Sequence, residues 1–176
     1  MLSRLNDDIR TRFENIVGKG MGVLIGDANG SDKAVQRFFK DSDYRNVWIY
    51  CSGVECRNNE GSWEEVHVEV KRSKKDRVYY GAKDIRMAED CDYGFMLWDG
   101  ESSGTLSNVV NILNRNKHCM LYISPRRTFS FLRSFADFEP ILRSLPPDVI
   151  EELDRKIELR DRVNGLIAGS QKELKI

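Results

Sequence analysis

The sequence has few histidines, few prolines, no excess charge of either sign and no long apolar run. Its 176 residues include two histidines and four prolines, and 28 basic residues balance 28 acidic ones. This neutral total argues against a binder of duplex nucleic acid, which uses excess lysine and arginine to displace counterions. No apolar run approaches the roughly 18 residues of a membrane span, and the first residues lack the apolar core of a secretory signal. We therefore expect a soluble cytoplasmic protein with no membrane partner.

The cysteines and histidines are scattered along the chain. Cys51, Cys56, Cys91 and Cys119 show no CxxC spacing, and the histidines are His67 and His118. Buried or near-surface thiols are common in cytosolic proteins, so we expect all four cysteines to be reduced. No Cys/His cluster has the spacing of metal ligands, which argues against a zinc site. The sequence thus predicts neither a metal nor a cofactor.

Apolar strands, glycine loops and amphipathic helices alternate along the chain. An amphipathic helix ends near Gly18, and Ser31 or Asp32 is expected to cap the next helix. Apart from a short strand around residues 66–70, residues 52–77 are expected to form a polar connection. The alternation predicts an α/β fold, namely a Rossmann-like, doubly wound parallel sheet of four or five strands with extra N- and C-terminal helices. The main strands are expected at residues 22–25, 47–51, 93–98 and 119–123.

The last part of the chain differs from this pattern. Pro146-Pro147 ends an apolar segment, and Pro147 or Asp148 is expected to start a final helix. We interpret residues 1–146 as one α/β domain and residues 147–176 as a helical extension. The extension is expected to pack either on the domain or on a second copy of the chain, and a homodimer is the expected assembly.

Two glycine loops follow predicted strands, at Gly26–Asp32 and at Asp99–Thr105. In open parallel sheets, ligands bind outside the carboxyl ends of the strands, where helix N-termini present backbone N–H groups. Such an end favours phosphate because of its partial positive charge. The alternative is that each loop is only a tight strand-to-helix turn. The first loop has neither the Gly-Lys-Ser/Thr ending of a Walker A loop nor a complete GxGxxG fingerprint.

Two segments resemble a known superfamily. VLIGDANGSDKAVQRFF is similar to the opening strand, loop and helix of the SLOG superfamily. AKDIRMAEDCDYGFMLWDGESSGTLSNVVNIL resembles the later part, where a strand leads into the glycine–threonine phosphate loop. This superfamily includes lonely-guy-type phosphoribohydrolases, DprA-like proteins and YspA-like nucleotide-binding domains. The Asp-Gly followed by Ser-Gly-Thr is also similar to nucleoside 2-deoxyribosyltransferases.

The resemblance implies a Rossmann-like nucleotide-binding domain and assigns roles to both loops. The residues that would hold a phosphate are Gly100, Ser102, Ser103, Gly104 and Thr105. Those that would face the ribose or a second phosphate are Gly26, Asp27, Asn29, Gly30 and Asp32. For the base, Trp63 is the expected stacking partner, whereas Trp98 is expected in the core.

The sequence departs from the hydrolases of this superfamily at two places. Their catalytic glutamate, three residues past the loop threonine, is replaced by Asn108, and their Arg-Lys pair by Lys83-Asp84. An amide cannot act as a general base, so we expect a nucleotide or nucleotide-sugar binding protein, such as a sensor. The alternative is an N-glycosidic hydrolase or deoxyribosyltransferase that uses Asp99 and Asp84 as its carboxylates. In either case Lys83 and Asn108 are expected to contact the ligand, and Asp32 is expected to be a helix cap.

Overall fold

The computed structural model describes residues 5–71 and 74–165, and the chain divides into two compact units. Unit 1 covers residues 1–90 and unit 2 covers residues 91–176. Each unit contains a three-stranded sheet and several helices, so the fold is mixed α/β as expected. The predicted extension at 147–176 continues beyond residue 165, outside the described residues.

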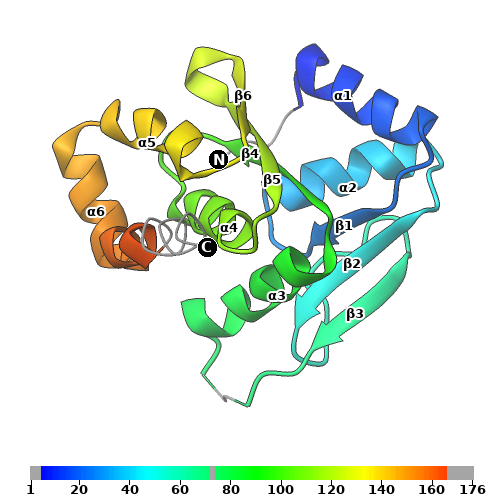
Figure 1. The fold of residues 1–176 in the computed structure, drawn as a ribbon. Helices are drawn as coiled ribbons and strands as arrows, with labels where there is room; N and C mark the ends of the chain where they lie inside the picture. The colour runs from blue at the N-terminus through cyan, green and yellow to red at the C-terminus, as the bar shows by residue number, and fades with distance from the viewer. Residues whose placement is uncertain (1–4, 72–73, 166–176) are drawn as a thin grey trace, which may run out of the picture. The chain divides into compact units, whose positions relative to one another are not determined.

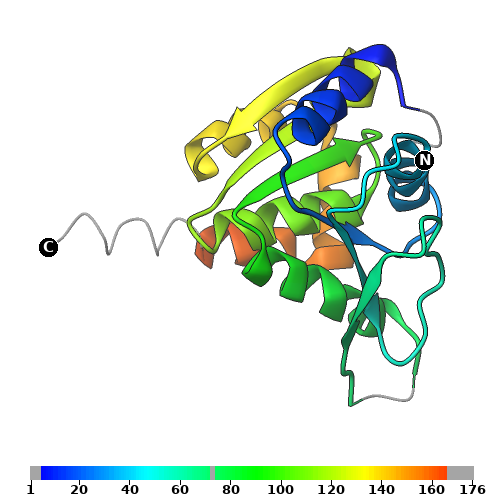
Figure 2. The same ribbon diagram turned by 90° about the vertical axis from the view of Figure 1, so that its right-hand side faces the viewer.

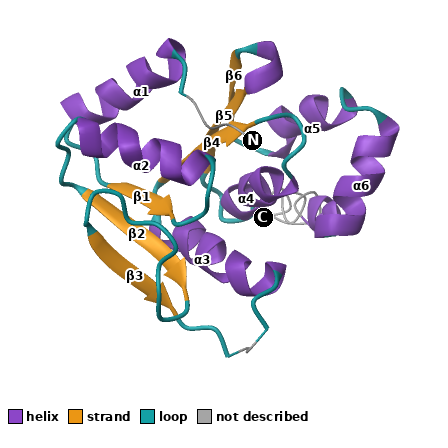
Figure 3. Cartoon of the chain, turned by 180° about the vertical axis from the view of Figure 1, so that it is seen from behind, coloured by secondary structure: helices purple, strands orange, loops and turns teal. Residues whose placement is uncertain are grey.

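Unit 1 is built on a parallel sheet with the strand order β1-β2-β3 (Figure 1). Its elements are α1 (Asp7–Gly18), β1 (Val23–Gly26), α2 (Ser31–Asp41), β2 (Val47–Ser52), β3 (Glu64–Val68) and α3 (Arg77–Asp90). Figure 3 shows β2 between the other two strands. Helix α3 packs mainly on β2 and β3, and α2 packs on β1.

The core of unit 1 is aromatic and aliphatic. Phe13 of α1 lies with its ring centroid 5.3 Å from those of Phe38 and Phe39 in α2, so these two helices pack together through their phenylalanines. Ile49 in the central strand is fully buried, as expected for a strand covered on both faces. The β-branched and aromatic character of β2 thus fits its central place.

Helix α2 begins at Ser31, within the predicted start, but its cap differs from the prediction. Its N-cap is Gly30, which has a φ of +92° and therefore a conformation that favours glycine. Asp32 does not cap the helix; its Oδ2 accepts a hydrogen bond from the backbone N–H of Ala28, 3.0 Å away. The prediction that Ser31 or Asp32 caps α2 was wrong, because the glycine turn places the helix start one residue after Gly30 and turns Asp32 toward the loop.

The connection between β2 and β3 contains no helix, although the two strands are parallel. The chain turns at Gly53, where φ is +83°, and reaches β3 through residues 54–63. This turn brings Cys56 back against β2, where it forms a disulfide with Cys51. The expectation of four reduced thiols was therefore wrong for this pair, because a spacing of five residues indicates no pairing until the turn at Gly53 is known.

Unit 2 contains β4 (Tyr93–Trp98), α4 (Ser103–Leu113), β5 (His118–Ile123), the 3₁₀ turn η1 (Ser124–Arg126), β6 (Thr128–Leu132), α5 (Phe135–Arg143) and α6 (Pro147–Ile157). The strand order is β4-β5-β6, with β4 parallel to β5 and β6 antiparallel to it. Figure 2 shows α4 running along β4 and β5, on which it packs. The antiparallel strand β6 was not expected, because its aromatic residues were interpreted only as an apolar segment.

The C-terminal part of the described chain packs on unit 2 itself. Helix α6 begins at Pro147, as predicted, and contacts α4. Beyond α6, the Arg162 guanidinium donates to Ser107 Oγ at 2.7 Å and to Asn111 Oδ1 at 2.6 Å. Both acceptors belong to α4, so the segment after α6 is tied to that helix.

Candidate functional site

The loop after β1 is formed around a buried glycine. A Cβ on Gly26 would collide with the Asp32 carboxylate and would lie 2.6 Å from Lys83 Nζ. The Gly26 carbonyl accepts a hydrogen bond from the buried Gln36 amide at 2.8 Å. Gly26 is therefore required for the close approach of charged side chains to the end of β1.

Lys83 is the centre of a buried charge cluster. Its side chain is only 5% exposed, and its ammonium lies 2.6 Å from Asp84 Oδ1, 3.8 Å from Asp32 Oδ2 and 4.0 Å from Asp27 Oδ1. Burial opposes the charged lysine, but Asp84 and Asp32 hold the pKa of Lys83 above its ordinary value. Lys83 is thus a charged residue that joins α3 to the loop after β1.

Asp27 is bound by the connection between β2 and β3. Its two carboxylate oxygens accept hydrogen bonds from Arg57 Nη2 at 2.6 Å and Arg57 Nε at 3.0 Å. The Arg57 guanidinium also stacks on Tyr80, with Cζ 4.2 Å from the ring centroid. Burial raises the pKa of Asp27, yet the bonds from Arg57 outweigh it and leave that pKa below its ordinary value. Asp27 therefore anchors the loop as a carboxylate, because its environment favours the ionised form.

Asp32 differs from the other two carboxylates in its surroundings. Its side chain is 32% exposed, and its closest cation, Lys83, lies 3.8 Å away. Partial burial raises the pKa of Asp32, although Lys83 and the Ala28 N–H oppose this effect. The environment of Asp32 therefore favours proton uptake.

The rest of the first loop is held by amide side chains. Asn58 Nδ2 donates to the Asp27 carbonyl at 2.8 Å and to Asn29 Oδ1 at 3.0 Å. Asn29 itself is exposed. The structure therefore brings together the predicted residues Gly26, Asp27, Asn29, Asp32, Lys83 and Asp84. Arg57 and Asn58 were not predicted, since they lie in a polar connection without a motif.

The loop after β4 is organised by its own backbone. Asp99 Oδ1 accepts hydrogen bonds from the N–H groups of Ser102 at 2.7 Å and Glu101 at 3.1 Å. Burial raises the pKa of Asp99, but these two bonds lower it by a larger amount. The pKa therefore stays below its ordinary value. Gly100 has a φ of +93°, and a Cβ there would lie 3.0 Å from Pro125 Cγ. Asp99 thus shapes the turn that leads into α4.

The first turn of α4 carries small and hydroxyl residues. Ser102 is the N-cap residue without a side-chain cap bond, and Thr105 Oγ1 lies 3.3 Å from Ser102 Oγ. Gly104 is exposed, and a Cβ there would meet only Ser102 Oγ, at 3.9 Å. The first turn contains no acidic residue, whereas those of α1, α2, α5 and α6 do. An anion is favoured at such a helix end.

Asn108 lies one turn further along α4 and is half-buried. Its Oδ1 is 3.5 Å from Asn111 Nδ2 on the same helix. Asn108 thus lies one helical turn beyond Thr105. Hydrolases of the resembled superfamily have a glutamate at this position, and this chain has an amide.

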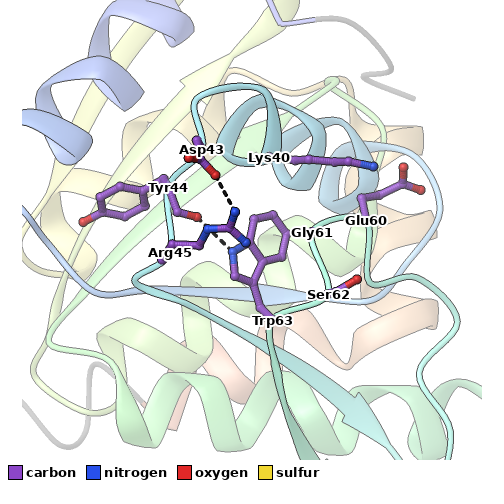
Figure 4. A pocket seen from close by; sticks show the side chains of 8 residues that line it. All are labelled: Lys40, Asp43, Tyr44, Arg45, Glu60, Gly61, Ser62 and Trp63. Atoms are coloured by element: carbon purple, nitrogen blue, oxygen red, sulfur yellow. Dashed lines mark hydrogen bonds and ion pairs between the residues drawn. The ribbon is translucent and has the colours of Figure 1, made fainter.

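A pocket of about 330 Å³ in unit 1 is lined by residues outside the Gly26 loop. Figure 4 shows its lining by Lys40, Asp43, Tyr44, Arg45, Glu60, Gly61, Ser62 and Trp63. These residues precede β2 and β3, so the pocket lies near the amino ends of the strands, whereas the Gly26 loop follows a carboxyl end. Ligands of parallel sheets bind at the carboxyl ends, which argues against a nucleotide in this pocket.

Trp63 is a poor stacking platform for a base. Its side chain is 8% exposed, and Nε1 donates to the Tyr44 carbonyl at 2.9 Å. Gly61 lies so close to the six-membered ring that a Cβ would overlap it. Trp63 therefore belongs to the wall of the pocket. Trp98 is 1% exposed and lies in the core, as predicted.

No protein-family model, curated protein or solved structure matches this chain. Among residues 5–71 and 74–165, no helix has both the length and the apolar character needed to span a membrane.

Proposed function

We propose that the chain is a nucleotide or nucleotide-sugar binding protein of the SLOG type. The observation that carries the proposal is the start of α4, where hydroxyl groups and an exposed glycine accompany a first turn without acidic residues. Backbone N–H groups in such a turn bind phosphate well. The half-buried Ser102 and Thr105 hydroxyls add further donors.

The loop after β1 favours sugar hydroxyls over a second phosphate. Asp27, Asp32 and Asp84 face the two cations Lys83 and Arg57, so the ionised cluster has one excess negative charge. A phosphate would be repelled by this charge, whereas ribose hydroxyls donate readily to carboxylates. We therefore assign sugar hydroxyls, and no phosphate, to the loop after β1.

A Rossmann-like, doubly wound sheet and a homodimer belong to the same proposal. The parallel pairs β1–β2, β2–β3 and β4–β5 support the first part. Light scattering of the purified protein tests the second part, because a homodimer has twice the mass of the 20.4 kDa chain.

Binding is tested by calorimetry with a nucleoside 5′-monophosphate, the matching nucleoside and ribose 5-phosphate. We expect the nucleoside to bind much more weakly than the monophosphate, since it lacks the group that the α4 turn would hold. Gly104→Ala should weaken monophosphate binding about tenfold or more, because its methyl group occupies the open space beside the turn. Gly81→Ala is the matched control, as Gly81 also lies in a helix with no atom within 4 Å of a Cβ. Equal affinity of nucleoside and monophosphate would refute the phosphate assignment.

N-glycosidic cleavage is the second candidate function, and the surroundings of Asp32 favour it. Cleavage needs a carboxyl group that can protonate the leaving base, and the raised pKa of Asp32 suits this role. Asp99, bound by two N–H groups, and Asp84, paired with Lys83, suit positioning. Chromatographic detection of released base tests this candidate, and release should fall in Asp32→Asn. Undiminished release in that variant would exclude Asp32 as the acid.

A further inference from the structure

A second polar cluster lies at the edge of the sheet in unit 1, where β2 and β3 run in parallel. Cys51 of β2 and His67 of β3 are direct register partners, and Glu65 lies on the same face of β3, two residues before His67. The turn at Gly53 returns Cys56 to the same place. The ligand atoms of these four residues all lie within 4.8 Å of one another.

The distances between these atoms suit a zinc ion. Cys51 Sγ and His67 Nδ1 are 3.5 Å apart. Zinc binds sulfur at about 2.3 Å and imidazole nitrogen at about 2.0–2.1 Å, which in a tetrahedral site separates the two ligand atoms by about 3.6 Å. Even in the disulfide form, the β2–β3 register therefore holds the Cys51 sulfur and the His67 imidazole at the spacing of two zinc ligands.

Glu65 supplies the contact that orients a metal-binding histidine. Its Oε2 lies 3.2 Å from His67 Nε2, on the ring edge away from Cys51. Metal-binding histidines commonly donate their second ring N–H to a carboxylate, which fixes the tautomer and the ring orientation. His67 and Glu65 are both exposed, so a cation can reach the cluster from solvent.

We propose that Cys51, Cys56 and His67 bind one zinc ion when the two cysteines are reduced, with Glu65 as the positioning residue of His67. The disulfide and the zinc site exclude each other, because both use the same two sulfur atoms. The cluster would thus exist in two states, a disulfide and a zinc thiolate site. This inference is independent of the nucleotide proposal, since it uses other residues and needs no nucleotide.

A phosphine and water convert the disulfide into two thiols, with the phosphine oxide as the other product. The phosphine supplies two electrons and takes up the oxygen of water, the S–S bond breaks, and the two sulfur atoms take up the two protons. Zinc then replaces the two thiol protons, which pass to the buffer. In the zinc form, Nδ1 of His67, which lies 3.0 Å from the Gly53 carbonyl in the disulfide form, binds the metal without a proton, and the Nε2–H group faces Glu65.

The test is a zinc titration of the full chain in competition with a chromophoric chelator, after reduction by a phosphine and without nucleotide. We expect one equivalent of zinc to bind to the reduced protein and none at this site in the oxidised protein. Cobalt is the spectroscopic probe: two thiolates and an imidazole should give a sulfur-to-cobalt charge-transfer band and strong visible absorption typical of tetrahedral cobalt.

Substitutions distinguish the residues that bind zinc from those that only lie near it or outside the cluster. Cys51→Ser and Cys56→Ser should each abolish the one-equivalent binding, and Glu65→Gln should weaken it by about 10–100-fold. Cys91→Ser is the matched control, because Cys91 is a thiol outside the cluster, and its zinc affinity should equal that of the unchanged protein. Circular dichroism verifies that each variant is folded, and the cobalt spectrum of the unchanged protein tests the site without any substitution.

Three results would overturn the proposal. These are failure of the fully reduced protein to bind one zinc ion, unchanged affinity in folded Cys56→Ser, and equal zinc binding by the oxidised protein. None of them bears on nucleotide binding, so this inference and the proposed function fail separately.

Discussion

The loops after β1 and β4 look alike in sequence but are stabilised in different ways. Both follow an apolar strand, contain glycine and aspartate, and lead into a helix. The first is held by side chains from distant parts of unit 1, such as Arg57 and Lys83. The second is held by hydrogen bonds that the Asp99 carboxylate accepts from the N–H groups of Glu101 and Ser102. The comparison shows that a strand–glycine–helix pattern predicts where a loop lies but not which interactions stabilise it.

The largest expected effect comes from removing the cation at the centre of the first loop. Lys83→Met leaves Asp27, Asp32 and Asp84 without their shared lysine, and breaking a buried ion pair in this way costs about 3–5 kcal/mol. Urea unfolding measures the change. Lys33→Met is the control, because Lys33 pairs with Glu60 near the surface and should cost less than about 1 kcal/mol. Similar losses in the two variants would contradict a cluster centred on Lys83.

Asp27→Asn should lower the free energy of unfolding by about 1.5–3 kcal/mol at neutral pH, since Arg57 loses a charged partner. The lowered pKa of Asp27 means that this stabilisation is present above its unfolded pKa of about 3.9 and disappears as the pH falls toward the folded pKa. The difference between the unchanged protein and Asp27→Asn should therefore shrink in acid. Unfolding curves at several pH values check this.

Asp32→Asn provides the contrast within the same loop. A folded pKa raised above the unfolded one gives stability at low pH that is lost as the pH rises through the folded pKa. At neutral pH the substitution should therefore change the free energy of unfolding by less than about 1 kcal/mol. A loss as large as that of Asp27→Asn would show that Asp32 is a structural ion-pair partner.

Substitutions in the loop after β4 should lower the free energy of unfolding less than Lys83→Met does, because the interactions of this loop are local. Asp99→Ala removes the acceptor of two backbone N–H groups and should cost about 0.5–2 kcal/mol, as the loss of a helix cap does. Asp99→Asn keeps an acceptor oxygen and should cost less. Thermal unfolding of both variants tests this order, and a loss above that of Lys83→Met would reverse our comparison of the loops.

The smallest expected effect is a stabilisation. Gly104→Ala should raise the free energy of unfolding by about 0.5–1 kcal/mol, since alanine is favoured over glycine in a helix and the space is open. Gly81→Ala in α3 should do the same. If Gly104→Ala is more stable yet binds the nucleoside monophosphate more weakly, the glycine is kept for the ligand; a destabilised variant would indicate a packing role.

The sequence predicted the elements better than the contacts between them. The glycine-bounded apolar run predicted β1, the aromatic run predicted β2, and Pro147 marked the start of α6, because these signals are local. The antiparallel strand β6 was missed, since a run of phenylalanines has no clear period. The pairing of Cys51 with Cys56, and of Cys51 with His67, depends on the Gly53 turn and on the β2–β3 register, which no local pattern specifies.

The same limit applies to the candidate site. Lys83 and Asp84 were recognised as candidates because they replace the Arg-Lys pair of the resembled superfamily, and Asp32 because it belongs to the first loop. Burial of Lys83 among three carboxylates could not be predicted, because Asp27 lies 56 residues earlier and only tertiary packing joins the two. Arg57 carried no signal at all, since it lies in a polar connection that resembles any exposed loop.

Strand β3 ends its three-stranded sheet, and its outer edge has a consequence for self-association. An uncovered strand edge can recruit a strand from another molecule and start aggregation, unless charges prevent it. Glu64 and Glu65 are both exposed on β3, and Glu69 follows the strand. If two copies of the chain approached edge to edge, their glutamates would repel one another. This repulsion discourages the pairing of β3 strands from two molecules. Replacing these glutamates with glutamine would remove the repulsion, so such a variant is where fibril formation should first appear.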